Sequence, residues 1–130
     1  MPIRSSIRVL VIDDYHGAAI GIATYLALAG MEARTAGCCG DALETIQNWM
    51  PDVVLLDIWM PQRDGFSTAE AIRKCMPGNR PYVIAFTAAD RAFVMGNPAS
   101  QYLDGYCKKG ISPDAIVSLV MGIFYEGAQS

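Results

Sequence analysis

The sequence has little charge, and it has no apolar run long enough to cross a bilayer. Asp, Glu, Lys and Arg make up 18% of the 130 residues, against about 25% in typical soluble domains, and the formal net charge is −3. Because no basic stripe is present, nucleic-acid binding is not expected. The long stretch without a formal charge that includes residues 16–31 is shorter than the ~18–20 residues of a membrane-spanning helix. We therefore expect it to form a buried helix, without membrane insertion.

The start of this sequence shows no signal-peptide pattern, and its cysteines form no zinc motif. Residues 1–6 contain no apolar core of the secretory type, so a cytoplasmic location is expected. The four cysteines are Cys38, Cys39, Cys75 and Cys107. They have no C-x-x-C spacing and no nearby histidine to complete a zinc set, so we expect reduced thiols. The length fits a single domain over residues 1–130. We expect this domain to be free-standing, with a piece of a longer regulator or hybrid kinase as the open alternative.

Three short apolar runs each end at side chains that carry oxygen. The runs and the residues after them are 9–12 with Asp13 and Asp14, 53–56 with Asp57, and 82–86 with Thr87. Runs of this length that are apolar without alternation indicate strands covered on both faces, as in a parallel sheet flanked by helices. Because ligands of such sheets bind beyond the carboxyl ends of the strands, the acids and the hydroxyl are expected to meet at one edge.

Helical patterns alternate with these strands, which predicts an α/β fold of five strand–helix units, (βα)5. The expected strands are residues 7–12, 32–36, 53–56, 82–86 and 105–108. The expected helices are residues 15–29, 41–50, 65–76, 90–95 and one that starts at Ser112. Right-handed crossovers and a reversal of winding after the second strand give a doubly wound, five-stranded parallel sheet in the flavodoxin-like order 2-1-3-4-5.

Local signals predict the helix ends and core faces. Gly30 is expected to end the first helix in a left-handed conformation, while Asp64 and Ser112 are expected to cap later helices. The fourth helix should be short because residues 96–98 interrupt it with glycine and proline. The expected core face of the second helix consists of Leu43, Ile46 and Met50.

The predicted edge has the residue types of a phosphoryl-transfer site. Three carboxylates close together repel one another unless a cation lies among them, and Mg²⁺ is typically held by one or two carboxylates together with a phosphate oxygen. Asp57, in the middle of the crevice, could attack a phosphoryl group as a nucleophile. A threonine hydroxyl and a lysine would contact the phosphoryl oxygens, and Thr87 and the Lys108-Lys109 pair are available for this.

The order and spacing of these residues resemble the response-regulator receiver domains of two-component signalling, of the chemotaxis-receiver type. The motifs that carry the resemblance are Asp13-Asp14, Asp57 within residues 55–61, Asp64-Gly65, Thr87-Ala88, and Tyr106 three residues before Lys109. The resemblance implies that Asp57 takes a phosphoryl group from a histidine kinase or a histidine phosphotransfer protein. It further implies a switch that changes contacts with a downstream protein target. Such a domain is not an enzyme, although it assists its own phosphorylation and dephosphorylation.

The same resemblance implies a role for each site residue. The implied Mg²⁺ ligands are Asp13, Asp14, Asp57 and the backbone carbonyl of Trp59. Lys109 would pair with the phosphate, and Thr87 with Tyr106 would form the switch. Trp59 and Ala89, two residues beyond the phosphoacceptor and the threonine, carry no group that orients water. We therefore expect a long-lived phosphoryl group.

The sequence departs from the family pattern in two places. Gly110 follows Lys109 where the family usually has a proline with a cis bond, so a trans bond and a less firmly placed lysine are expected. The interrupted fourth helix lies in the face that receivers use for dimers and outputs. These departures leave open an alternative, a phosphorylation-independent pseudo-receiver that acts as a protein-binding module. An aspartyl-nucleophile phosphatase fits less well, because it would want a second acid at position 59.

The first and fifth helices have more apolar surface than one core-facing stripe requires. Residues 17–31 carry no charge, and residues 116–125 are apolar around more than one side of the expected helix. We expect these helices to form a partner surface or a homodimer contact.

Overall fold

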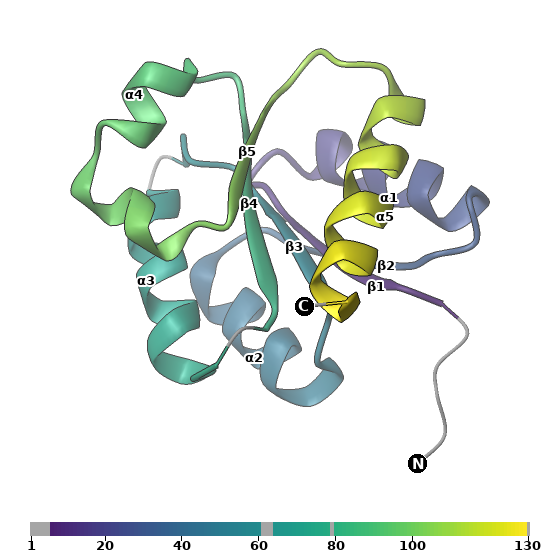
Figure 1. The fold of residues 1–130 in the computed structure, drawn as a ribbon, viewed down its shortest axis with the longest axis horizontal. Helices are drawn as coiled ribbons and strands as arrows, with labels where there is room; N and C mark the ends of the chain where they lie inside the picture. Colours follow the sequence, from purple (N-terminus) through teal and green to yellow (C-terminus); the bar gives the residue numbers. More distant parts are fainter. Residues whose placement is uncertain (1–5, 61–63, 79, 130) are drawn as a thin grey trace.

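The described residues form a five-stranded parallel sheet with helices on both faces (Figure 1). The structure is a computed structural model that describes residues 6–60, 64–78 and 80–129. The strands are β1 (Arg8–Ile12), β2 (Glu32–Ala36), β3 (Val53–Leu56), β4 (Tyr82–Thr87) and β5 (Gly105–Lys108). Their order is β2-β1-β3-β4-β5, which confirms the predicted fold class. Pro61, the last residue of the motif around Asp57, and residues 1–5 lie outside the described residues.

Helices α1 and α5 cover one face of the sheet, and α2 and α3 cover the other (Figure 1). The helices of the described chain are α1 (His16–Leu28), α2 (Cys39–Trp49), α3 (Gly65–Cys75), α4 (Arg91–Met95), the 3-10 helix η1 (Pro98–Tyr102) and α5 (Pro113–Gln129). The fourth helix is short, as predicted. No helix among the residues that the structure describes is long and apolar enough to cross a membrane.

The central strands are apolar on both sides because each side packs against helices. On β3, Val53 and Leu55 belong to the core shared with α1 and α5, whereas Val54 and Leu56 belong to the core shared with α2 and α3. All four side chains are at most 1% exposed. Full burial of such a side chain stabilises the fold by about 1.5–3 kcal/mol, so this pattern fixes β3 at the centre of the sheet.

The predicted left-handed end of α1 is confirmed. Gly30 has φ of +92°, its N–H donates to the carbonyl of Ala27 at 3.0 Å, and the N–H of Met31 donates to the carbonyl of Leu26 at 3.1 Å. These two bonds form a Schellman motif, in which glycine takes the left-handed conformation without a steric penalty. The motif turns the chain directly into β2.

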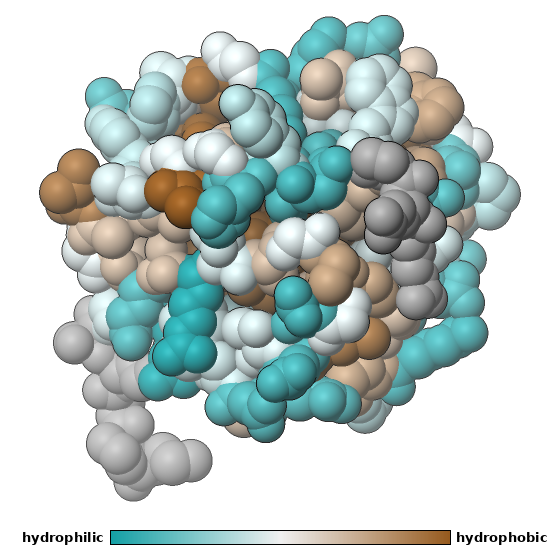
Figure 2. Space-filling model, turned by 180° about the vertical axis from the view of Figure 1, so that it is seen from behind, coloured by the Kyte–Doolittle hydropathy of each residue, from teal (hydrophilic) through white to brown (hydrophobic). Residues whose placement is uncertain are grey.

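The prediction that α1 is buried was wrong. Only one stripe of the helix, Ala19, Ala23 and Leu26, is buried against the sheet, and Leu28 is 81% exposed. The absence of charge in α1 therefore marks apolar surface rather than burial on all sides. The face opposite to that of Figure 1 mixes hydrophilic and hydrophobic residues in small areas (Figure 2).

The predicted core face of α2 was also partly wrong. The helix starts two residues earlier than expected, at Cys39, and Met50 lies outside it with φ of +56° and 58% exposure. Trp49 takes the core position instead, and the guanidinium of Arg34 lies 4.5 Å from the centre of its ring. The indole of Trp49 buries more apolar area than a methionine would, and Pro51 disfavours helical geometry at the residue before it.

Candidate functional site

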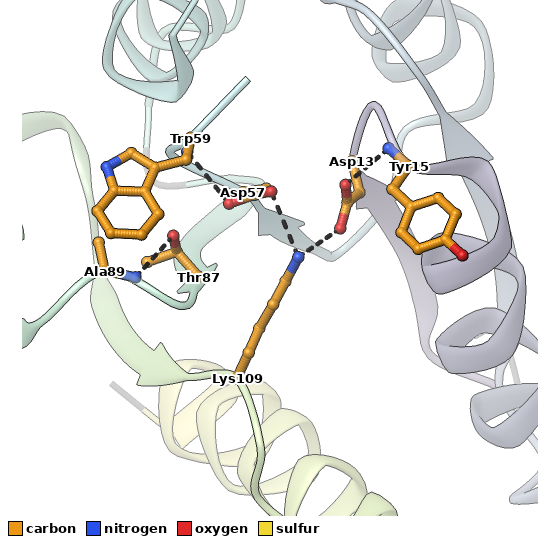
Figure 3. A network of polar contacts seen from close by, with 7 residues as sticks. All are labelled: Asp13, Tyr15, Asp57, Trp59, Thr87, Ala89 and Lys109. Atoms are coloured by element: carbon orange, nitrogen blue, oxygen red, sulfur yellow. Dashed lines mark hydrogen bonds and ion pairs between the residues drawn. The ribbon is translucent and has the colours of Figure 1, made fainter. Parts of the chain in front are cut away.

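Side chains at or just after the carboxyl ends of four strands meet at one edge of the sheet (Figure 3). Asp13 follows β1 and Asp57 follows β3, and these neighbouring strands are parallel and in register. Thr87 ends β4, and Lys109 follows β5. The edge therefore holds the residues that the sequence predicted for it.

The three acids of the predicted metal site lie together. Asp13, Asp14 and Asp57 each offer a carboxylate oxygen, and these oxygens are within 4.8 Å of one another. Asp13 and Asp57 are only 4% and 7% exposed, whereas Asp14 is exposed. The backbone N–H of Tyr15 donates to Asp13 Oδ1 at 2.9 Å, and the N–H of Trp59 donates to Asp57 Oδ1 at 3.1 Å. These bonds offset part of the cost of burying two carboxylates.

Lys109 offsets part of the negative charge of the two buried acids. Its Nζ donates to Asp13 Oδ2 at 2.6 Å and to Asp57 Oδ2 at 3.3 Å (Figure 3). Burial alone would lower the pKa of Lys109, but the contacts with Asp13 and Asp57 outweigh burial and raise the pKa above its usual range. The ammonium therefore stays charged between the carboxylates. Lys108 is exposed and pairs at 2.8 Å with the exposed Asp90.

Gly110 has a conformational role of its own. Its φ is +107°, and the bond between Lys109 and Gly110 is trans, as predicted. A proline, whose φ is fixed near −65°, could not adopt this geometry, so glycine is required by the path that the chain takes here. This path leaves Lys109 in contact with both acids.

The two residues of the predicted switch are joined through a third. Thr87 is fully buried, and its Oγ1 accepts from the N–H of Ala89 at 3.3 Å. Tyr106 is half-buried, and its hydroxyl donates to the carbonyl of Ala89 at 2.5 Å. The guanidinium of Arg91 lies 5.7 Å from the centre of the Tyr106 ring. The loop after β4 is thus held from both sides at Ala89.

The indole of Trp59 leans toward α4. It is 56% exposed, and its ring centroid lies 6.0 Å from that of Phe93 on α4. Figure 3 shows the indole on the same side of Asp57 as Ala89 and Thr87. Sequence reasoning missed Phe93, because nothing in the spacing of a short interrupted helix predicts a contact with the loop after β3.

A close backbone approach holds the loop after Asp57. The N–H of Gly65 donates to the carbonyl of Ile58 at 2.9 Å, and a Cβ at Gly65 would lie 2.3 Å from the carbonyl oxygen of Asp57. Asp64 caps α3 as predicted, with its Oδ1 accepting from the N–H of Ser67 at 2.8 Å. The start of α3 is therefore fixed against the site.

The substitution Gly65→Ala is expected to lower the free energy of unfolding by about 1–3 kcal/mol or more, because the new methyl group would overlap the backbone after β3. Gly122→Ala is the matched control: nothing lies within 4 Å of its Cβ position in α5, so it should stabilise by about 0.5–1 kcal/mol. Urea unfolding of both variants measures the difference. Equal stability of the two variants would contradict the close approach.

Comparison with known sequences identifies the family of the chain. The family model described as the response regulator receiver domain matches residues 9–121. The transcriptional regulatory protein MctR from Rhizobium johnstonii is 33% identical over 119 residues, which make up 90% of this chain and 55% of MctR. This chain spans about half the length, or less, of the first curated relatives that it matches.

Comparison with solved structures agrees. A CheY-like response regulator receiver domain protein from Methanospirillum hungatei has a TM-score of 0.82 at 23% identity over 96% of this chain and 98% of its own, a likeness of fold. The response regulator protein TrrA from Thermotoga maritima, solved in complex with Mg(2+)-BeF, has a TM-score of 0.76 at 28% identity over 89% of this chain and 97% of its own. With a family model that spans residues 9–121, the chain belongs to the response regulator receiver domain family.

Proposed function

We propose that this chain is a phosphoacceptor that takes a phosphoryl group on Asp57 from a histidine kinase or a histidine phosphotransfer protein and then changes its protein contacts. The observation that carries the proposal is the position of Lys109, whose Nζ contacts both Asp57 and Asp13 in the crevice. A nucleophilic carboxylate beside a fixed cation is the arrangement that phosphoryl transfer to an aspartate needs.

In the proposed reaction an oxygen of Asp57 attacks the phosphorus, and the bond from phosphorus to the donor nitrogen breaks with its electron pair going to the donor imidazole. Lys109 neutralises charge on the phosphoryl oxygens, and the hydroxyl of Thr87 donates a hydrogen bond to one of them. The loop that joins Thr87 to Tyr106 through Ala89 supports a role of these residues as the switch. The protein is proposed to assist this transfer and its own later dephosphorylation by water rather than to turn over a substrate.

The acid cluster fits Mg²⁺, since its donors are hard oxygens within 4.8 Å of one another and the single positive charge of Lys109 leaves the three acids with an excess of negative charge. The proposed ligands are Asp13, Asp14, Asp57 and the backbone carbonyl of Trp59. When bound, the ion supplies positive charge for the phosphoryl oxygens. TrrA, solved with Mg(2+)-BeF, supports this choice of cofactor.

Asp14→Ala is expected to weaken Mg²⁺ binding about tenfold or more, because it removes a charged oxygen donor without disturbing the buried acids. Glu44→Ala, at an exposed position of α2, is the control and should bind as the parent does. Isothermal titration with MgCl₂ measures both. Binding should also fade on acidification, because protonated carboxylates do not hold the ion. A binding constant insensitive to Asp14→Ala would contradict the proposed ligand set.

The proposed function as a whole is tested with acetyl phosphate as a small phosphodonor. Incubation with acetyl phosphate and Mg²⁺ should add the mass of one phosphoryl group, and a chelator should prevent the addition. An unchanged mass in both samples would favour the alternative, a pseudo-receiver that binds partners without phosphate.

The proposed partners are proteins, and the proposed location is the cytoplasm. The relative MctR is named a transcriptional regulatory protein, so an output through a DNA-binding partner or segment is part of the proposal. A homodimer or partner contact through α1 and α5 is supported by their exposed apolar side chains, which are Ile20, Leu28, Met121 and Tyr125.

A further inference from the structure

Three aromatic rings, of Phe66, Phe93 and Trp59, form a row from the core to the loop that follows Asp57. Phe66, in the first turn of α3, is 8% exposed, and its ring centroid lies 6.3 Å from that of Phe93. Phe93, which is 53% exposed on α4, in turn lies 6.0 Å from Trp59 with the two ring planes at 59°. Tilted aromatic pairs at these distances attract one another beyond the effect of burial alone. The buried Phe66 therefore anchors Phe93, and Phe93 contacts Trp59.

The side chain of Trp59 depends on this contact. Its backbone is fixed, because its N–H donates to Asp57 Oδ1 at 3.1 Å. Its indole is 56% exposed, and among the described residues Phe93 is the one aromatic ring that it contacts. A half-exposed side chain with two rotatable bonds samples several rotamers unless a neighbour restricts it. Phe93 is that neighbour.

We propose that Phe93 is a positioning residue that holds the Trp59 indole beside Asp57 and thereby slows hydrolysis of a phosphoryl group there; this inference rests on the proposed function. In hydrolysis, a water oxygen attacks the phosphorus and the bond between phosphorus and the Asp57 oxygen breaks. The bonding electrons return to the carboxylate, inorganic phosphate leaves, and the water proton passes to solvent. An indole held beside this approach occupies space that water needs, and it offers no carboxylate or amide to orient water.

Phe93→Ala should accelerate the decay of the phosphorylated protein about three- to tenfold. This is the change in rate that corresponds to losing the attraction of one aromatic pair. Two variants serve as controls. Met95→Ala, at a similarly exposed position on α4, should decay at the parental rate. Phe93→Tyr keeps the ring and should restore the slow decay. Decay is followed by intact mass after acetyl phosphate is removed.

A double-mutant cycle tests whether Phe93 acts through Trp59. In a Trp59→Ala background, Phe93→Ala should cause no further acceleration. The inference would be overturned if the accelerations caused by the two single substitutions multiply in the double variant. It would also be overturned if Phe93→Ala decays at the parental rate. Failure of the parent to take up any phosphoryl group would instead overturn the proposed function.

A spectroscopic measurement tests positioning without any phosphoryl group. The chain has two tryptophans, so Trp49→Phe leaves Trp59 as the sole indole fluorophore. In this background, Phe93→Ala should lower the fluorescence anisotropy of Trp59 and increase its quenching by acrylamide, and Met95→Ala should change neither. Identical anisotropy and quenching in both variants would show that Phe93 does not hold the indole.

Discussion

Asp57→Asn should abolish phosphoryl uptake, slowing it by about a thousandfold or more, because an amide oxygen cannot replace the carboxylate nucleophile. The change is nearly isosteric, and the amide oxygen can still accept the bond from the Trp59 N–H. The buried loop should therefore keep its shape. Uptake is measured by intact mass at fixed times after addition of acetyl phosphate and Mg²⁺.

Asp52→Asn is the matched control for this experiment. Asp52 is also a buried acid, 2% exposed, but it precedes β3 at the opposite edge of the sheet. It accepts from the N–H of Arg8 at 2.9 Å and pairs with Arg80 at 3.2 Å. Its variant should take up phosphate at the parental rate. Labelling of Asp57→Asn at the parental rate would refute the proposed mechanism.

The double substitution Trp59→Asn with Ala89→Glu should accelerate dephosphorylation by about one to two orders of magnitude, or about 1.4–2.7 kcal/mol of barrier. Trp59 and Ala89 lie on the same side of Asp57 (Figure 3). Neither side chain has a carboxylate or an amide that can orient a water molecule for attack. Asparagine and glutamate supply groups that can. Ala89 is fully buried, so the glutamate replaces a small side chain at a packed position.

Decay of the phosphorylated double variant is compared with that of the parent after removal of the donor. Urea unfolding of both proteins checks that the buried position tolerates the glutamate. If a folded double variant decays at the parental rate, or if the parent itself decays rapidly, access to the phosphoryl group is controlled by other residues.

The fold and the site edge could be predicted because a few short segments are unambiguous. β3 is apolar at every position and ends directly before Asp57. A short strand with this pattern is expected where helices cover both faces of the sheet. Once β1 and β3 are neighbours in a parallel sheet, Asp13 and Asp57 must share an edge. The contacts of Lys109 with these acids follow from the same topology.

Other features depend on tertiary contacts that a local pattern does not contain. Trp49 rather than Met50 enters the core because the chain turns left-handed before Pro51. The contact of Trp59 with Phe93 requires the short α4 to be placed over the loop after β3, which no residue spacing encodes. The positive φ of Gly110 likewise depends on the path from β5 to α5.

Chemical location of the phosphoryl group tests the central claim most directly. An acyl phosphate on aspartate is reduced by borohydride to homoserine, so peptide mapping after acetyl phosphate, Mg²⁺ and borohydride identifies the modified residue. We predict homoserine at position 57 alone, and none in a sample treated with chelator. Modification at Asp13, Asp14 or Asp52 in place of Asp57, or no modified peptide at all, would contradict Asp57 as the phosphoacceptor.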